Sequence, residues 1–108
     1  MEEIINLYED RNWVDAPEYS SGSMKKVLHD ENGLKTVLLR LPEGFYMAPH
    51  AHISAEQHFV LKGEYLSDGK SYPEGTFRYF AAHENHGPFE SKLGALILVI
   101  WHPATTEN

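Results

Sequence analysis

The stretch Gly44-Phe-Tyr-Met-Ala-Pro-His50-Ala-His52-Ile-Ser-Ala-Glu56-Gln-His-Phe-Val-Leu-Lys-Gly63 decides the fold of this chain. His50 and His52 are two residues apart, so in an extended segment their imidazoles lie on the same face. Glu56 follows after a short bend and completes a set of three ligands on one side of a metal ion. Two imidazoles and one carboxylate, with open positions opposite, are typical of non-haem iron and related divalent metals. The stretch therefore predicts a metal site.

Strand-like runs separated by turn signals lie on both sides of this stretch. Asn32-Gly33 and Asp68-Gly69 are typical of tight hairpins, and Pro42-Glu-Gly44 and Pro73-Glu-Gly75 are typical of turns. The turns recur about every ten residues, a spacing typical of sandwiches and small barrels. The sequence therefore predicts an all-β fold. The expected strands are Met24–Leu28, Lys35–Arg40, Phe45–Met47, Gln57–Lys62, Thr76–Phe80 and Ala95–Trp101.

Two segments show no clear alternation of apolar and polar residues. Ala95–Trp101 is apolar throughout, which predicts a strand buried on both faces, with a partner subunit as one possible cover. Residues 1–8 have some helical character, but Ile4-Ile5-Asn6-Leu7 fits an edge or exchanged strand equally well. Because small β-barrels with a very apolar strand usually cover it, we expect a homodimer.

Composition narrows the class of protein. At 108 residues the chain is expected to form one domain, residues 1–108. Its net charge of −7 argues against a nucleic-acid partner, because phosphate binding needs a basic face. The absence of cysteine excludes disulfides, thiolate metal sites and cysteine nucleophiles. No apolar run is long enough to cross a membrane and the acidic N-terminus is unlike a signal peptide, so we expect a cytoplasmic protein without membrane contact.

The second half of the chain adds a motif that resembles a known family. Pro73-Glu-Gly75 is followed eleven residues after Gly75 by His86 and then Gly87-Pro88. Together with the complete motif from Gly44 to Gly63, these residues resemble the cupins, and more narrowly the ChrR-type cupin-like domains. That group is related to the acetylacetone-cleaving and dihydroxyacetophenone dioxygenase cupins. The resemblance implies a small double-stranded β-helix, the jelly-roll barrel of RmlC-like cupins, over about residues 13–103.

The resemblance also implies one divalent metal ion inside the barrel. Its ligands by motif position would be His50, His52, Glu56 and His86. The chain departs from the family pattern just before the last histidine, where prolines and a glycine are usual and the sequence reads Phe80-Ala-Ala-His83-Glu-Asn85. Without those residues the path of the loop is open, and His83 is the alternative fourth ligand.

Several other residues are candidates for roles near the metal. His58 lies two residues after Glu56, which favours the same strand face, where it could hydrogen-bond the ligand carboxylate, meet substrate or pack in the core. His58 and His83 are the candidate catalytic bases. His29 and His102 are expected at the surface, with the barrel mouth as a second place for His102. Seven residues are candidates for an apolar pocket wall, although plain core is the more frequent role of strand aromatics: Arg40, Tyr46, Met47, Phe59, Phe77, Tyr79 and Phe89.

The function expected from the resemblance is that of a non-haem metal-dependent dioxygenase, an oxidoreductase. Three imidazoles and one carboxylate leave two neighbouring positions of an octahedral ion for a chelating small molecule, such as a β-dicarbonyl or a hydroxyketone. Fe(II) is the expected working metal, and the same ligands accept Zn(II), Ni(II) or Mn(II). The alternative is a non-enzymatic metal- or ligand-sensing module of a regulatory system, although no segment of the sequence resembles the sigma-binding half of such regulators.

Overall fold

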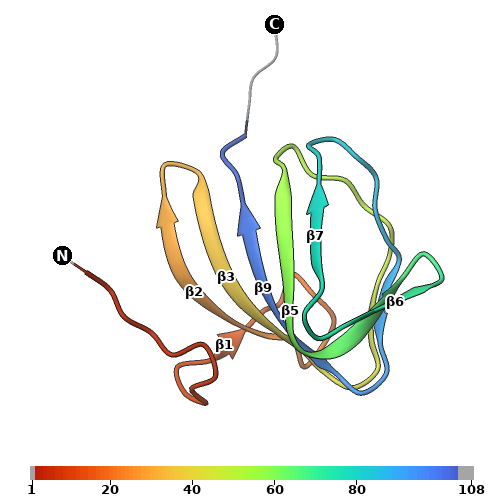
Figure 1. Cartoon of the computed structure of the whole chain (residues 1–108), viewed down its shortest axis with the longest axis horizontal. Helices are drawn as coiled ribbons and strands as arrows, with labels where there is room; N and C mark the ends of the chain where they lie inside the picture. Colours follow the sequence, from red (N-terminus) through yellow and green to blue (C-terminus); the bar gives the residue numbers. More distant parts are fainter. Residues whose placement is uncertain (1, 105–108) are drawn as a thin grey trace, which may run out of the picture.

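The computed structural model describes residues 2–104, and this part of the chain folds into strands without a helix that could cross a membrane. Nine strands form one curled antiparallel sheet (Figure 1). The all-β prediction is therefore confirmed. The strands are β1 (Val14–Asp15), β2 (Met24–Glu31), β3 (Leu34–Leu41), β4 (Phe45–Met47), β5 (Glu56–Ser67), β6 (Lys70–Pro73), β7 (Phe77–Phe80), β8 (Phe89–Ser91) and β9 (Ala95–Trp101).

Strand β5 joins the two halves of the sheet. Its first part pairs with β7 and β9, and β9 continues through β3 and β2 to β1. Its second part pairs with β6 and β8, and β8 continues to β4. The chain thus curls the sheet around one interior, and the same strand contributes side chains to both halves of the wall.

The course of β5 depends on Gly63, the last residue of the motif. The register with β9 shifts between Val60 and Lys62, and Gly63 adopts a φ of 72°. A Cβ at this position would collide with the carbonyl oxygen of Gly94. Glycine is therefore needed here both for the left-handed backbone and for the close approach of a neighbouring chain segment.

Both predicted dipeptide hairpins form. Asn32 and Gly33 have φ angles of 53° and 86° between β2 and β3, and Asp68 and Gly69 have 51° and 78° between β5 and β6. Positive φ at both central residues defines the turn whose twist matches that of the flanking strands. The turn chemistry of the sequence thus sets the register of these two strand pairs.

All six predicted strands are present, and three further strands were not predicted. Strands β4 and β9 have the predicted bounds, β2, β3 and β5 are longer, and β7 begins one residue later. The additional strands β1, β6 and β8 are only two to four residues long. Each pairs with a longer strand, so their extended backbone is stabilised by the sheet and has no pattern of its own.

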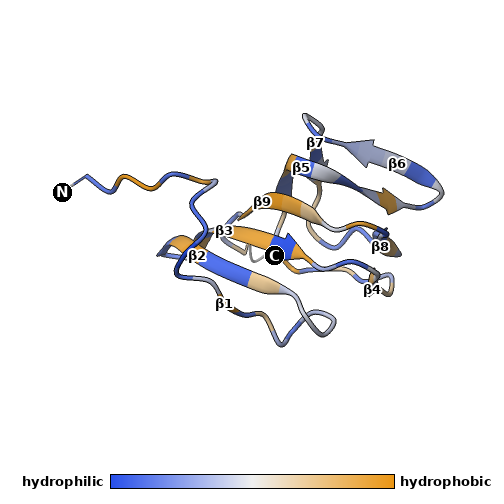
Figure 2. Cartoon of the chain, turned by 90° about the horizontal axis from the view of Figure 1, so that it is seen from below, coloured by the Kyte–Doolittle hydropathy of each residue, from blue (hydrophilic) through white to orange (hydrophobic). Residues whose placement is uncertain are grey.

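The core lies on the concave side of the sheet. Strands β3 and β9 contribute the most apolar stretch of it, as the colouring of Figure 2 shows. Because the two strands are paired along seven residues, their inward side chains form a continuous apolar surface. The residues of these two strands that belong to the buried core cluster are Leu39, Leu41, Ala95, Ile97 and Val99.

The outer face of β9 is less covered than the sequence predicts. Leu96 is buried there, but Leu98 and Ile100 are only half-buried. The prediction of two buried faces therefore holds fully only at the Leu96 end. The face beyond it is apolar and partly open to solvent.

The N-terminal segment of the single chain forms neither a helix nor an edge strand. Residues 2–13 are without helix or strand, so these two readings of residues 2–8 are wrong, and Met1 lies outside the described residues. An exchanged strand, which needs a second copy of the chain, stays a prediction. The segment contacts cations on the outer face of the sheet. Lys26 Nζ donates to the carbonyl of Glu9, and the Trp13 ring lies 4.5 Å from the guanidinium of Arg40. Such contacts, and not a periodic apolar face, set its course.

Candidate metal centre

A pair of backbone hydrogen bonds holds His50 beside His86. The N–H of His50 donates to the carbonyl of His86 at 2.9 Å, and the N–H of His86 donates back at 2.8 Å. The two ring centroids lie 4.5 Å apart. Gly87 permits this approach of the loops, because a Cβ there would lie 3.0 Å from Cα of Pro49. Closure of the barrel thus brings two histidines from distant loops together.

His52 completes the group of imidazoles at the barrel mouth. Its ring centroid lies 4.7 Å from that of His50 and 5.7 Å from that of His86, and its side chain is exposed. The backbone N–H of His83 donates to the carbonyl of His52 at 2.7 Å, but the His83 side chain is exposed and outside the group. Of the two alternatives, the structure brings His86 to the other histidines, while His83 supports His52 through its backbone.

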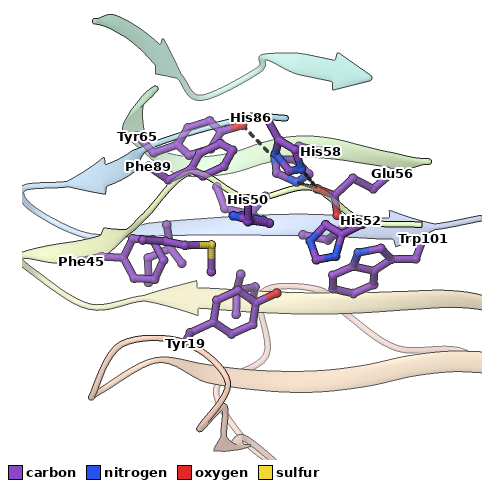
Figure 3. A pocket seen from close by; sticks show the side chains of 15 residues that line it. Tyr19, Phe45, His50, His52, Glu56, His58, Tyr65, His86, Phe89 and Trp101 are labelled. Carbon is purple, nitrogen blue, oxygen red and sulfur yellow. Dashed lines mark hydrogen bonds and ion pairs between the residues drawn. The ribbon is translucent and has the colours of Figure 1, made fainter. Parts of the chain in front are cut away.

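Glu56 reaches the same point from the regular part of β5. Its side chain is buried, and its Oε1 lies 3.4 Å from Nε2 of His86 (Figure 3). One potential ligand atom from each of His50, His52, Glu56 and His86 lies within 4.8 Å of the others. Ligand atoms at about 2.1 Å from one ion lie about 3.0 to 3.4 Å apart when they are neighbours. The four residues are therefore positioned to bind a metal ion, with a small contraction of the group.

The charge states of the two buried members suit a cation. Burial lowers the pKa of His86 to about 4, against the opposing effect of the Glu56 charge, so the imidazole is neutral at neutral pH. Burial alone would raise the pKa of Glu56, but the hydrogen bond and charge of His58 and the charges of the other histidines bring it below its ordinary value. A neutral imidazole and an ionised carboxylate are the forms that bind metal.

The hydrogen bonds of the histidine rings also fit a metal site. Nδ1 of His50 lies 3.1 Å from the carbonyl of Ala48, so it donates there and leaves Nε2 with a free lone pair. Within residues 2–104, the buried Nδ1 of His86 has no hydrogen-bond partner. A buried imidazole and a buried carboxylate with so few internal partners are unfavourable for the protein alone. A divalent cation would compensate it.

The remaining histidines occupy three different surroundings. His58 faces the interior beside Glu56, as strand alternation predicts, with its Nε2 at 3.5 Å from Glu56 Oε1. His29 is exposed, as expected. His102 is half-buried on the outer face, 2.7 Å from the amide nitrogen of Gln57, and does not line the cavity mouth. Catalytic roles for His58 and His83 stay predictions.

An apolar cavity lies next to the four candidate ligands. Its atom-free space is about 420 Å³, part of it open to solvent. Side chains of β3, β4, β5, β8 and β9 and of three loops form its wall. The lining residues are Tyr19, Leu39, Leu41, Phe45, Met47, His50, His52, Glu56, His58, Tyr65, His86, Phe89, Ile97, Val99 and Trp101.

Two of the seven candidate wall residues, Met47 and Phe89, line this cavity. The other five candidates do not line it: Arg40, Tyr46, Phe59, Phe77 and Tyr79. Phe59 is three residues from Glu56 and therefore on the opposite strand face, where its ring lies 5.0 Å from that of its cross-strand neighbour Phe77. The same alternation turns Tyr79 outward.

The cavity wall includes two tyrosines that sequence reasoning missed, Tyr65 on β5 and Tyr19. Tyr19 comes from the loop between β1 and β2, packs against Phe45 at 6.4 Å between ring centroids, and directs its hydroxyl into the cavity (Figure 3). Within residues 2–104 this hydroxyl makes no hydrogen bond to another residue. Burial, followed by the Glu56 charge, raises the pKa of Tyr19 above its ordinary range, so the group stays a donor. Its loop has no periodic pattern that would have marked it.

The sequence matches the family model of the ChrR cupin-like domain over residues 1–105. No curated protein sequence matches the chain. Among solved structures, an acetylacetone dioxygenase from Acinetobacter johnsonii is similar with a TM-score of 0.79 and 20% identity, covering 94% of this chain and 74% of that chain. An RmlC-like cupin from Shewanella frigidimarina has a TM-score of 0.76 and 22% identity over 95% of this chain and 93% of its own.

A third similar structure is the complex of Rhodobacter sphaeroides SigE with the anti-sigma ChrR. Its TM-score is 0.72 with 21% identity, over 88% of this chain and 51% of that chain. At these identities the likeness shows the fold. The predicted RmlC-like cupin barrel is therefore confirmed.

Proposed function

This chain belongs to the ChrR cupin-like domain family, and we propose that it is a metal-dependent dioxygenase with one divalent ion held by His50, His52, Glu56 and His86. The observation that carries the proposal is the position of these four side chains beside an otherwise largely apolar cavity. Fe(II) is the proposed working metal, and when bound it supplies Lewis acidity and electrons for reaction with O₂. Zn(II), Ni(II) and Mn(II) are alternatives for the same ligand set.

The proposed substrate is a small β-dicarbonyl or hydroxyketone. The aliphatic wall formed by Leu39, Ile97 and Val99 suits the alkyl or aryl part of such a molecule and excludes water. The Tyr19 hydroxyl would donate to a substrate oxygen that no other residue satisfies. For a β-dicarbonyl the balanced reaction breaks one carbon–carbon bond and adds both atoms of O₂, to give a carboxylic acid and a 2-oxo carbonyl compound.

Oxygen consumption tests the enzyme proposal. Metal-free protein is loaded with Fe(II), Mn(II) or Ni(II), and O₂ uptake is followed with a panel of diketones and hydroxyacetophenones. We expect uptake with at least one pair of metal and substrate, one O₂ for each substrate molecule lost. The His52→Ala variant under the same metal is the control for free metal ions. Absence of uptake across the panel, with metal bound, would overturn the enzyme proposal and leave the binding site intact.

The alternative function is a metal- or ligand-sensing module. The specific observation in its favour is the likeness to a structure in which ChrR is in complex with a sigma factor. A sensor would bind a small molecule at the metal without turnover. Calorimetry of metal-loaded protein with the same panel separates the two functions, because a sensor shows saturable binding without O₂ uptake.

The homodimer predicted from the sequence remains part of the proposal. Besides the half-open outer face of β9, the side chains of Phe77 and Tyr79 on β7 are 54% and 56% exposed. These apolar side chains provide a surface that a second copy could cover. Light scattering at micromolar concentration is the measurement, and a monomer mass would remove this part of the proposal.

A further inference from the structure

A line of polar contacts runs from Glu56 away from the candidate metal centre. Oε1 of Glu56 lies 3.5 Å from Nε2 of His58, and Nδ1 of His58 lies 2.9 Å from the hydroxyl of Tyr65 (Figure 3). Nη1 of Arg78 donates to the same hydroxyl at 3.4 Å. The line joins β5 to β7 and ends at a half-buried cation.

The chemistry of Arg78 fixes the direction of these contacts. A guanidinium has only N–H donors, so the Tyr65 oxygen must be the acceptor of that contact. The Tyr65 side chain is 2% exposed, and within residues 2–104 its hydroxyl contacts only Arg78 and His58. Its own hydrogen therefore points to Nδ1 of His58, which must accept. Neutral His58 then carries its hydrogen on Nε2, the nitrogen that faces Glu56.

The surroundings of Arg78 explain why its guanidinium stays in place. It lies 4.0 Å above the ring of Tyr72 and 4.6 Å from the ring of Phe80. No carboxylate of residues 2–104 forms an ion pair with it. Aromatic rings, and not a counter-ion, hold this cation, which leaves its N–H groups free to act on Tyr65.

We propose that Arg78 and Tyr65 are positioning residues that fix the tautomer of His58, so that its Nε2–H donates to Glu56 and holds that carboxylate toward the metal. The inference rests on the proposed metal-binding function for its purpose, but the tautomer can be tested without metal. It also assigns His58 a positioning role and makes His58 unavailable as a general base. A ligand carboxylate with an oxygen held by a donor cannot rotate freely, which favours one coordination geometry.

Long-range ¹H–¹⁵N NMR of the metal-free protein tests the tautomer. The His58 signals are identified by their loss in His58→Gln. We expect wild-type His58 to be the Nε2–H tautomer, with Nδ1 at the shift of a hydrogen-bond acceptor. In Arg78→Met, Tyr65 can also accept, so the Nδ1–H tautomer should appear beside the first. His58 as the Nδ1–H tautomer in the wild type, or an unchanged spectrum in Arg78→Met, would overturn the inference.

Metal affinity gives the second readout, with a matched pair of variants. Tyr65→Phe removes the hydroxyl in the line, while Tyr72→Phe removes one from the neighbouring ring that stacks with Arg78. Competition with a chelator for Co(II) should show about tenfold weaker binding in Tyr65→Phe and less than about twofold change in Tyr72→Phe. The visible absorption of bound Co(II) should shift only in Tyr65→Phe. Equal affinities and spectra in the two variants would refute the positioning role, whereas failure of wild-type protein to bind Co(II) would refute the proposed function instead.

Discussion

The two walls of the cavity are built in opposite ways. Strands β3 and β9 form one wall from regular, continuously paired backbone, with inward aliphatic side chains such as Leu39 and Ile97. The other wall holds the candidate ligands, of which His50, His52 and His86 come from loops between strands. The first wall gains stability from burial of apolar surface, while the second buries polar groups that have few partners of their own. The aliphatic wall therefore stabilises the fold in which the ligand wall can exist.

The largest expected effect is the loss of metal affinity in His52→Ala. This side chain is exposed, so its removal should leave the fold intact while the centre loses one of four ligands. Because loss of partners outside the ligand shell already weakens binding by up to about 100-fold, we expect about 1,000-fold here. Elemental analysis and chelator competition measure it, and His83→Ala, outside the group, is the matched control. Metal loss in His83→Ala but not in His52→Ala would mean that a different set of residues binds the metal.

A substitution in the aliphatic wall should lower stability and leave metal affinity nearly unchanged. Ile97→Ala removes buried apolar volume from β9 and should lower the free energy of unfolding by about 3 kcal/mol. Metal affinity of the folded variant should change by less than about threefold, since Ile97 is not among the four candidate ligands. Urea unfolding and chelator competition on the same preparation give both numbers. If the variant lost stability and metal affinity in equal measure, the two walls would not be separable.

The same contrast explains what the sequence could predict. His50, His52 and Glu56 lie within seven residues, so local spacing alone places them together. His86 required the family resemblance, because it meets His50 only when the barrel closes through reciprocal backbone hydrogen bonds. The distance from Pro73-Glu-Gly75 favoured His86 over His83 through the same resemblance, and the loop geometry brings His86 to the other histidines.

Two other residues show two different reasons why the sequence did not identify the cavity wall correctly. Phe59 was a candidate for the cavity wall, but strand alternation from Glu56 already places it on the opposite face of β5. Tyr19 had no usable signal, because it lies in a turn that reaches the cavity only through contacts with the distant Phe45. The positioning role proposed for Arg78 likewise depends on the register in which β5 pairs with β7, which places Arg78 opposite His58.

Acid should lower the stability of the metal-free protein through His86, in the wall that holds the candidate ligands. The pKa of His86 is about 4 in the folded protein, against 6.5 for an unperturbed histidine, so between these values unfolding takes up a proton. The stability that neutral His86 contributes is thus present above pH 6.5 and is lost as the pH falls toward 4. The free energy of unfolding should fall by about 2 kcal/mol over this window relative to His86→Gln. Urea unfolding at several pH values measures it, and parallel curves for the two proteins would contradict the buried, neutral state of His86.

The smallest expected effect belongs to Tyr19, which lies between the two walls. Tyr19→Phe keeps the ring that packs on Phe45 and removes a hydroxyl without a protein partner among residues 2–104, so neither stability nor metal affinity should change by more than about 0.5 kcal/mol. If this hydroxyl donates to a molecule bound at the metal, loss of that hydrogen bond should lower the affinity for the molecule by about fivefold to tenfold. Absorption titration of metal-loaded protein with pentane-2,4-dione measures it, with Tyr46→Phe on the exposed face of β4 as the matched control. Equal dione affinity in the two variants would mean that Tyr19 only packs against the aliphatic wall. Weaker affinity in Tyr19→Phe alone would mean that the Tyr19 hydroxyl is the polar group by which that wall contributes to ligand binding.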